Sequence, residues 1–322
     1  MGLNLIDYFC GKHCTMLKGS YNDLNGLSKF ILLITLVFSF LLFSTLLGIL
    51  VLVPFFGTGV IDLLSVPDYS SVQVVNGLKA LQVISMAGGL LLPAIIYLWL
   101  CSPDKKISAG LFKPVNFLPI IFSVLLMVFA QPLIGWATEI NSYFSLPEGL
   151  SFIENWMKNA EAQGEMITEA FLSTTSINGL LVNIFMVAIL PAFAEEILFR
   201  GALAGLFKDW TKNVHIAVLL SAFIFAAIHL QFYGFLPRFL LGIALGYLYF
   251  WSGSLWLPIA AHFTNNFLSV MVEFLYRKGA ITTNAENFGM NNAAWLTVIS
   301  IVGVTGILYS IYTLTLKTRK EG

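Results

Sequence analysis

Long apolar runs without a charged side chain constrain this chain more than any other feature. Residues 30–61, for example, contain no Asp, Glu, Lys or Arg. A run of about 18 or more apolar residues is long enough for a helix to cross the hydrocarbon core of a bilayer. Only 11% of the residues are charged, whereas soluble domains carry about 25% charged residues. We therefore expect an integral membrane protein.

The sequence favours helical spans over a β-barrel, because the alternating strands of about ten residues that build a barrel do not occur in it. The predicted fold class is all-α: a polytopic membrane helical bundle with the active site inside, forming a single domain over residues 1–322. Gly and Pro interrupt several of the apolar runs, as transmembrane helices tolerate. Eight spans are expected, at Ser28–Phe55, Leu78–Cys101, Val115–Ala137, Ile177–Phe207, Val214–Leu230, Leu236–Trp251, Leu255–Tyr276 and Ala294–Leu316.

The distribution of basic residues predicts the orientation, because cytoplasmic loops carry an excess of Lys and Arg. With the N-terminus inside, five of the seventeen basic residues fall on the outer side: Lys79, Lys158, Arg238, Arg277 and Lys278. An even number of spans also places both termini on one side. We expect a multi-pass protein of the cell membrane, surrounded by membrane lipids, with both termini cytoplasmic. The formal net charge of zero gives no indication of nucleic acid as a partner.

A long outer loop, residues 138–176, contains one amphipathic segment. In "SFIENWMKNAEAQGEMITEAFL" the apolar residues recur at helical spacing and form one face: Phe152, Ile153, Trp156, Met157 and Ala160. A helix lying on the outer membrane surface fits this pattern. We favour an interfacial anchor over the alternative, a lid that covers a site.

Ionisable residues within the spans are the candidates for function, because charges in a membrane are expensive and usually face an interior cavity. Three clusters qualify, in "AFAEEILFRG", "FIFAAIHL" and "IAAHFTNNFL". They contain Glu195, Glu196 and Arg200, then His229, then His262, Asn265 and Asn266.

Helical spacing sorts the members of these clusters. Glu196 and Arg200 are separated by four residues, so they share a face and can pair. Glu195 is rotated by about 100° from Glu196 and is expected to point elsewhere, without an obvious local partner. His262 and Asn266 share a face in the same way. Asn265 points away from them and is expected to form hydrogen bonds with a neighbouring helix.

Four of these side chains are expected at a similar depth in the membrane. At a rise of about 1.5 Å per residue, Glu195, His229, His262 and Asn266 all fall in the middle of a hydrocarbon core about 30 Å thick. Glu195 could take a proton from water, and His229 could orient the same water. His262 and Asn266 could donate hydrogen bonds to a carbonyl oxygen as it becomes negative. This chemistry is peptide-bond hydrolysis within a membrane.

Other residues would support this chemistry. The pair of Glu196 and Arg200 is expected to hold Glu195 in place, and Phe225 is expected to pack beside His229 and exclude water. A zinc ion could activate the water instead, although the HExxH spacing of ordinary zinc proteases is absent. Its ligands would be Glu195, His229 and His262.

The three motifs also resemble those of a known family. "EEILFRG" fits EExxxR, "FAAIH" fits FxxxH and "HFTNN" fits HxxxN, in this order and within a motif-bearing core at residues 177–276. The chain resembles the intramembrane endopeptidases of the CAAX-processing and bacteriocin-processing family. The resemblance implies that Glu195 is the general base, that His229 lies beside the water, and that His262 and Asn266 stabilise the oxyanion. It also implies a peptide or a lipidated protein as substrate, and we favour a metal-free mechanism.

Two other classes of function remain open at this stage. Glu and His in the middle of a membrane also form the proton relays of transporters, although the internal repeats common in transporters are not visible in this sequence. A non-catalytic membrane scaffold or immunity protein could keep the same fold. Proton-coupled uptake would favour the transporter, and a biological effect that survives Glu195→Gln would favour the scaffold.

Overall fold

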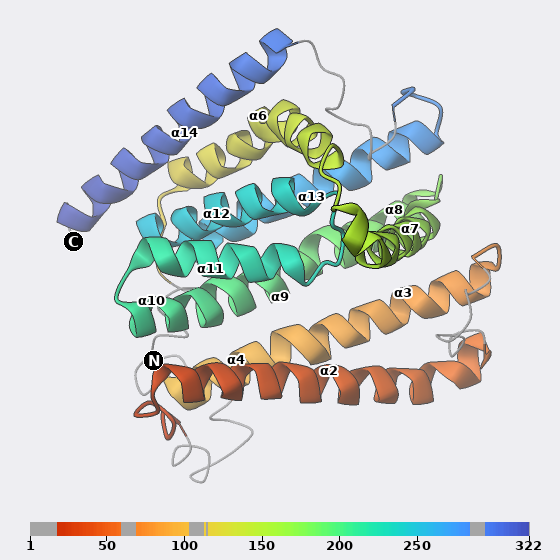
Figure 1. Cartoon of the computed structure of the whole chain (residues 1–322), viewed down its shortest axis with the longest axis horizontal. Helices are drawn as coiled ribbons and strands as arrows, with labels where there is room; N and C mark the ends of the chain where they lie inside the picture. The colour runs from red at the N-terminus through yellow and green to blue at the C-terminus, as the bar shows by residue number, and fades with distance from the viewer. Residues whose placement is uncertain (1–17, 59–68, 103–112, 114, 284–293, 322) are drawn as a thin grey trace.

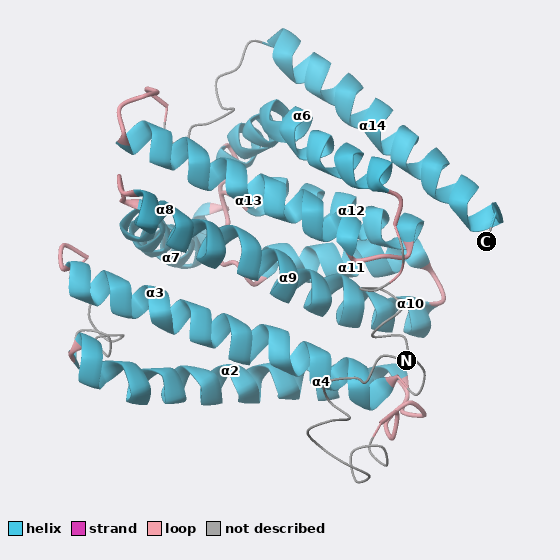
Figure 2. Ribbon diagram, turned by 180° about the vertical axis from the view of Figure 1, so that it is seen from behind, coloured by secondary structure: helices cyan, strands magenta, loops and turns pink. Residues whose placement is uncertain are grey.

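The computed structural model describes residues 18–58, 69–102, 113, 115–283 and 294–321, and within these ranges every regular element is helical (Figures 1 and 2). All eight predicted spans correspond to helices. Among the described residues, six helices are long and apolar enough to cross a membrane. The predicted polytopic helical bundle is therefore confirmed, and the chain is a multi-pass membrane protein.

The first half of the chain forms three spans. Helix α2 is Gly26–Phe56 and α6 is Phe117–Ser142. The second span is continuous through α3 (Val72–Met86), the π-helix η2 (Ala87–Leu91) and α4 (Leu92–Cys101). It begins at Val72 rather than at Leu78 as predicted, because the Ser71 side chain caps α3 by accepting a hydrogen bond from the Val74 amide.

The second half of the chain contains the motifs. The short 3₁₀ helix η3 (Glu148–Leu150) leads into α7 (Ser151–Leu172). The fourth span is α8 (Ile177–Asn183), η4 (Ile184–Ile189), α9 (Leu190–Glu196), η5 (Ile197–Ala204) and α10 (Gly205–Thr211). It is followed by α11 (Val214–Ala227), α12 (Phe235–Ser252), α13 (Trp256–Arg277) and α14 (Ala294–Glu321).

The surface of the bundle is apolar, as a lipid environment requires. On α2, Phe38, Phe43 and Leu50 are 69%, 64% and 73% exposed. Exposed apolar side chains on this scale would be a liability in water. They indicate that α2 faces lipid.

Proline explains two of the three π-helical segments. Pro93 and Pro191 each stand second in the α-helix that follows a π segment, η2 and η4 respectively. A proline inside a helix has no N–H to donate, and its ring clashes with the carbonyl of the preceding turn. The wider π turn before each proline accommodates the ring, so both spans continue. The third π segment, η5, begins directly after Glu196 and contains Arg200.

Small residues bring α11 and α12 into close contact. A Cβ atom on Gly242 would lie 2.9 Å from the Ala222 Cβ, and one on Gly246 would lie 3.0 Å from a Val218 methyl group. Gly242 and Gly246 form the GxxxG spacing by which membrane helices approach each other. This packing places the second half of α11, with Phe225, next to the Gly242 turn of α12.

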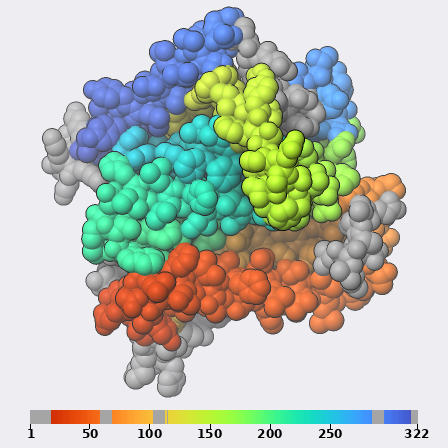
Figure 3. Space-filling model, viewed as in Figure 1, coloured from red at the N-terminus to blue at the C-terminus, as the bar shows by residue number. Residues whose placement is uncertain are grey.

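Helix α7 lies across one end of the bundle. It is foreshortened in Figures 1 and 2, whereas the spans run along the plane of the view, and it forms a yellow-green block beside α11 and α12 in Figure 3. Helix α2 begins and α14 ends at the opposite end of the bundle. Phe152 and Trp156 on α7 are 71% and 53% exposed. The position and the exposed apolar residues agree with a helix at the membrane surface.

Candidate active site

A buried ion pair lies at the junction of α9 and η5. The Arg200 Nη1 atom is 2.8 Å from Glu196 Oε1, and the two residues are 1% and 0% exposed. The predicted pairing of these residues is therefore confirmed. Arg200 also donates from Nη2 to the carbonyl oxygen of Gly242, at 3.1 Å. The same guanidinium lies over the Phe225 ring, 4.8 Å from its centroid, so this charge links the fourth span to α11 and α12.

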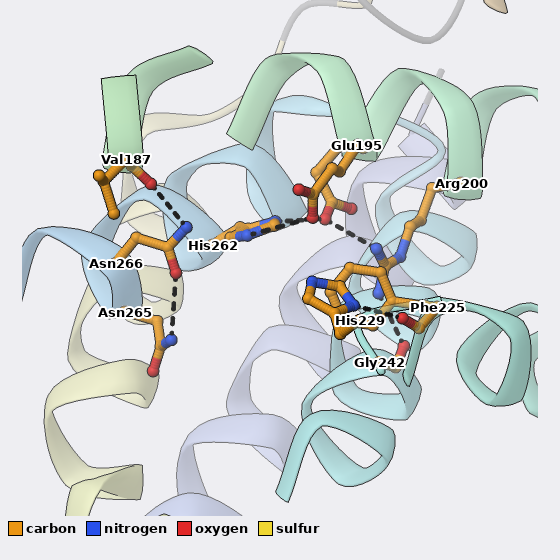
Figure 4. A network of polar contacts seen from close by, with 10 residues as sticks. Val187, Glu195, Arg200, Phe225, His229, Gly242, His262, Asn265 and Asn266 are labelled. Carbon is orange, nitrogen blue, oxygen red and sulfur yellow. Dashed lines mark hydrogen bonds and ion pairs between the residues drawn. The ribbon is translucent and has the colours of Figure 1, made fainter. Parts of the chain in front are cut away.

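His262 from α13 approaches the carboxylates of Glu195 and Glu196 (Figure 4). Its Nδ1 atom is 2.8 Å from Glu196 Oε1, and its Nε2 atom is 3.8 Å from Glu195 Oε2. A carboxylate can only accept a hydrogen bond, so Nδ1 carries the proton. The Nε2 distance is too long for a hydrogen bond. Glu195 and His262 are 8% and 3% exposed, so neither faces lipid.

The expectation that Glu195 points elsewhere than Glu196 is wrong, because both carboxylates approach nitrogens of the same imidazole ring. The described residues show no ion-pair partner for Glu195 on its own helix, as expected. A rotation of about 100° between neighbours separates their Cβ directions, but the ring of His262 is wide enough to meet both. Spacing within one helix cannot predict this contact because the ring comes from α13.

His229 lies in the turn directly after α11 and is held by the last turn of that helix. Its Nδ1 atom lies 2.6 Å from the Phe225 carbonyl oxygen. A carbonyl accepts only, so Nδ1 donates and Nε2 is left with a lone pair. The Phe225 ring, which is 2% exposed, lies 4.9 Å from the His229 ring and 6.0 Å from the His262 ring. Phe225 therefore packs against both imidazoles.

Asn266 is part of a chain of amides between helices. Its Nδ2 donates to the Val187 carbonyl in η4 at 3.0 Å, and its Oδ1 accepts from Asn265 at 3.3 Å. Asn265 in turn accepts a hydrogen bond from Gln131 of α6, at 3.4 Å, and so forms the contact with a neighbouring helix that the sequence predicted. One N–H of the Asn266 amide remains for another acceptor.

The loop between α11 and α12 is held firmly around His229. Leu230 has a positive φ of 52°, which turns the chain directly after His229. The Asn141 side chain of α6 donates to the Phe232 carbonyl at 2.8 Å and accepts from the Leu236 amide at 2.6 Å. Glu161 of α7 accepts from the Tyr233 amide at 2.8 Å. These contacts fix the position of the loop against α6 and α7.

A zinc site is not formed by these side chains. Within the ranges that the structure describes, no group of three or more His, Cys, Asp or Glu side chains is arranged to hold a metal ion. The ligand set considered from the sequence, Glu195, His229 and His262, therefore does not fit zinc in this arrangement.

Arg238 is a charged residue near these side chains that the sequence analysis did not single out. It was counted only as an outer basic residue at the start of a predicted span. It lies in the first turn of α12, and Nη2 donates to Gln231 Oε1. Its charge is close enough to interact with those of Glu195 and His229. The available signal was its place at the start of an apolar span, seven residues after Gln231 in "QFYGFLPRF".

A comparison with known protein families matches the segment that contains this site. Residues 177–268 match a family described as type II CAAX prenyl endopeptidase Rce1-like. The chain is also similar to the "Uncharacterized protein YpbD" of Bacillus subtilis (strain 168), with 35% identity over 85 residues, which is 25% of this chain and 40% of that relative. The chain thus matches less than half the length of this curated relative. No solved structure matches the chain.

Proposed function

We propose, from the match of residues 177–268 to the Rce1-like family, that the chain is an intramembrane endopeptidase acting on a membrane-associated peptide. The observation that carries this proposal is the buried contact of Glu195 and Glu196 with the two nitrogens of His262. Buried ionisable groups in a membrane are costly and usually serve function. The family description names a CAAX prenyl endopeptidase, so a lipidated peptide is the proposed substrate.

In the proposed reaction, Glu195 acts as the general base. A water between Glu195 and His229 gives its proton to the Glu195 carboxylate as its oxygen attacks the scissile carbonyl carbon. The Nε2 lone pair of His229 accepts a hydrogen bond from the same water and orients it. When the tetrahedral intermediate collapses, the C–N bond breaks and Glu195 returns the proton to the leaving amine.

The negative oxygen of the intermediate would be stabilised by two donors. One is the free N–H of Asn266 and the other is Nε2 of His262. Because Nδ1 of His262 already donates to Glu196, donation from Nε2 requires a second proton on the ring. Glu196 would then serve as the counter-charge that holds the ring in place, and Arg200 would hold the Glu196 carboxylate in position.

An apolar cavity supports a lipid chain as part of the substrate. It has a volume of about 430 Å³ and lies between α6, α12 and α14, with Leu133, Leu241 and Val304 among its lining residues. Its walls are almost wholly apolar, as a site for a hydrocarbon chain requires. We assign this cavity to the isoprenoid chain of the substrate.

The test is cleavage of a farnesylated CAAX peptide by the purified protein in detergent or in liposomes, followed by mass spectrometry. The expected result is release of a short C-terminal peptide, with a rate that does not fall after prolonged dialysis against a strong metal chelator. A rate that collapses on dialysis and returns with added zinc would contradict the metal-free mechanism. If the protein cleaves neither this peptide nor its unprenylated form, the proposed function is contradicted.

A further inference from the structure

Arg238 is a charged side chain whose hydrogen bonds are incomplete. Its Nη1 atom is buried and has no hydrogen-bond partner among the described residues. A buried donor without a partner costs free energy, and a buried cation costs more. Such groups in native structures usually indicate a water, an ion or a ligand.

The other arginines with described side chains provide the contrast. Arg200 pairs with Glu196, and Arg277 pairs with both Glu273 and Glu169. Arg238 forms no ion pair with any carboxylate in the described part of the chain. Glu161 is near enough for its charge to interact with that of Arg238, but its carboxylate accepts from the Tyr233 amide instead.

The backbone at Gly234 leaves room for the Arg238 guanidinium. A Cβ atom on Gly234 would collide with Nη1 of Arg238, so the absence of a side chain at Gly234 lets the guanidinium lie against the backbone. Arg238 also stands in the first turn of α12. The positive end of a helix dipole disfavours a cation and favours an anion, so the helix adds to the attraction for an anion at this point.

The position of Arg238 near Glu195 and His229 indicates which kind of anion it would bind. Arg238 follows the loop that begins at His229, and its charge interacts with His229 and Glu195. A guanidinium binds a carboxylate with two parallel hydrogen bonds. An endopeptidase substrate has carboxylates at its C-terminus and on acidic side chains.

We propose that Arg238 is a specificity-determining residue that binds a carboxylate of the peptide substrate and so sets which bond lies over Glu195. This assignment rests on the proposed endopeptidase function. The substrate carboxylate replaces Glu161 as the charge partner of Arg238. It also accepts the hydrogen bonds that the guanidinium otherwise lacks. The C-terminal carboxylate and an acidic side chain share this chemistry, and the experiment separates them.

The experiment compares farnesylated peptides that differ in one carboxylate. One pair has the same sequence with a C-terminal acid or a C-terminal amide, and a second pair has Asp or Asn beside the prenylated cysteine. The wild-type protein is expected to cleave the carboxylate form of one pair with a kcat/KM about 10- to 100-fold higher, because hydrogen bonds to charged groups are strong. The pair that shows the preference identifies the source of the carboxylate.

Two variants test the residue. Arg238→Gln is expected to lose the preference through a higher KM for the carboxylate peptide, while the neutral peptide is cleaved as by the wild type. Gly234→Ala keeps the charge but displaces the guanidinium, and it is expected to reduce the preference in the same way. Arg277→Gln and Gly205→Ala are the matched controls, since Arg277 has carboxylate partners and a Cβ on Gly205 would meet nothing within 4 Å. Melting temperatures verify that each variant is folded.

Two outcomes would overturn the assignment while the endopeptidase function stands. The first is equal cleavage of both members of each pair by the wild type. The second is an Arg238→Gln variant that slows all four peptides by the same factor, which would mean that Arg238 acts only on Glu195 and His229. If the wild type cleaves none of the peptides, the proposed function fails and this assignment fails with it.

Discussion

At the scale of single residues, the site depends on which helix supplies each contact. The pair of Glu196 and Arg200 follows from their spacing on one helix, and the structure contains it at 2.8 Å. The contact of His262 with both glutamates could not be derived from spacing, because depth along a helix does not fix the direction of a side chain from another helix. Arg238 was missed for a related reason: it was counted only as an outer basic residue, and its place in the first turn of α12 does not reveal which side chains of other helices lie near it.

Glu196→Gln tests the ion pair. The change leaves the Arg200 charge buried, with the Gly242 carbonyl and a neutral amide as partners, and removes the charge that holds His262 Nδ1. Removing one partner of a buried pair destabilises by about 3–5 kcal/mol, so a markedly lower melting temperature is expected. Lys158→Gln, which removes the exposed lysine of the pair with Glu154 on α7, serves as the control and should melt like the wild type. Equal melting temperatures for all three proteins would refute the role of the pair.

At the scale of helices, most of the fold follows from the sequence. The apolar runs predict each span because a chain in lipid must satisfy its backbone hydrogen bonds within a helix. The π segments were not predicted, and they depend on where proline and the packing of neighbouring helices interrupt the regular turn. The close approach of α11 to α12 depends on glycines that the sequence analysis treated only as interruptions.

Gly242→Ala tests that close approach. The added methyl group would lie 2.9 Å from the Ala222 Cβ and 3.1 Å from its Cα, so the backbones must move apart. Overpacking of this kind costs about 1–3 kcal/mol, and the same movement would disturb the bond from Arg200 to the Gly242 carbonyl. A lower melting temperature is expected, whereas Gly306→Ala on α14, where a Cβ would meet nothing within 4 Å, should leave it unchanged. A Gly242→Ala protein as stable as the wild type would show that the contact is not tight.

Leu241→Trp tests the cavity between α6, α12 and α14. The larger side chain fills part of the space assigned to the isoprenoid chain. We expect a higher KM for the farnesylated peptide and no change for the unprenylated peptide. Leu219→Trp, at a position on α11 that is 46% exposed, is the control for adding an indole to the bundle. If Leu241→Trp leaves the KM for both peptides unchanged, the lipid chain binds elsewhere.

At the scale of the whole molecule, the even number of spans brings the start of α2 and the end of α14 to one end of the bundle. The excess of basic residues predicts that this end is cytoplasmic. The arrangement of helices alone gives no direction in the membrane, so the orientation depends on the charge argument. Helix α7 and the entrance to α12 would then face outward.

Cysteine labelling in intact cells tests this orientation. In a background where Cys10, Cys14 and Cys101 are replaced by serine, Gly149→Cys is expected to react with a membrane-impermeant maleimide. Lys212→Cys, in the turn before α11, is expected to react only after the membrane is permeabilised. The reverse pattern would mean that both termini lie outside.

The central claim is that Glu195 activates the attacking water. The most direct measurement is the cleavage rate of a farnesylated CAAX peptide by purified Glu195→Gln, compared with the wild type and with Glu154→Gln at equal folded concentration. General bases contribute about 100- to 10,000-fold to a rate, so Glu195→Gln is expected to lose at least about 100-fold while Glu154→Gln keeps the wild-type rate. Cleavage by Glu195→Gln at the wild-type rate would contradict the account.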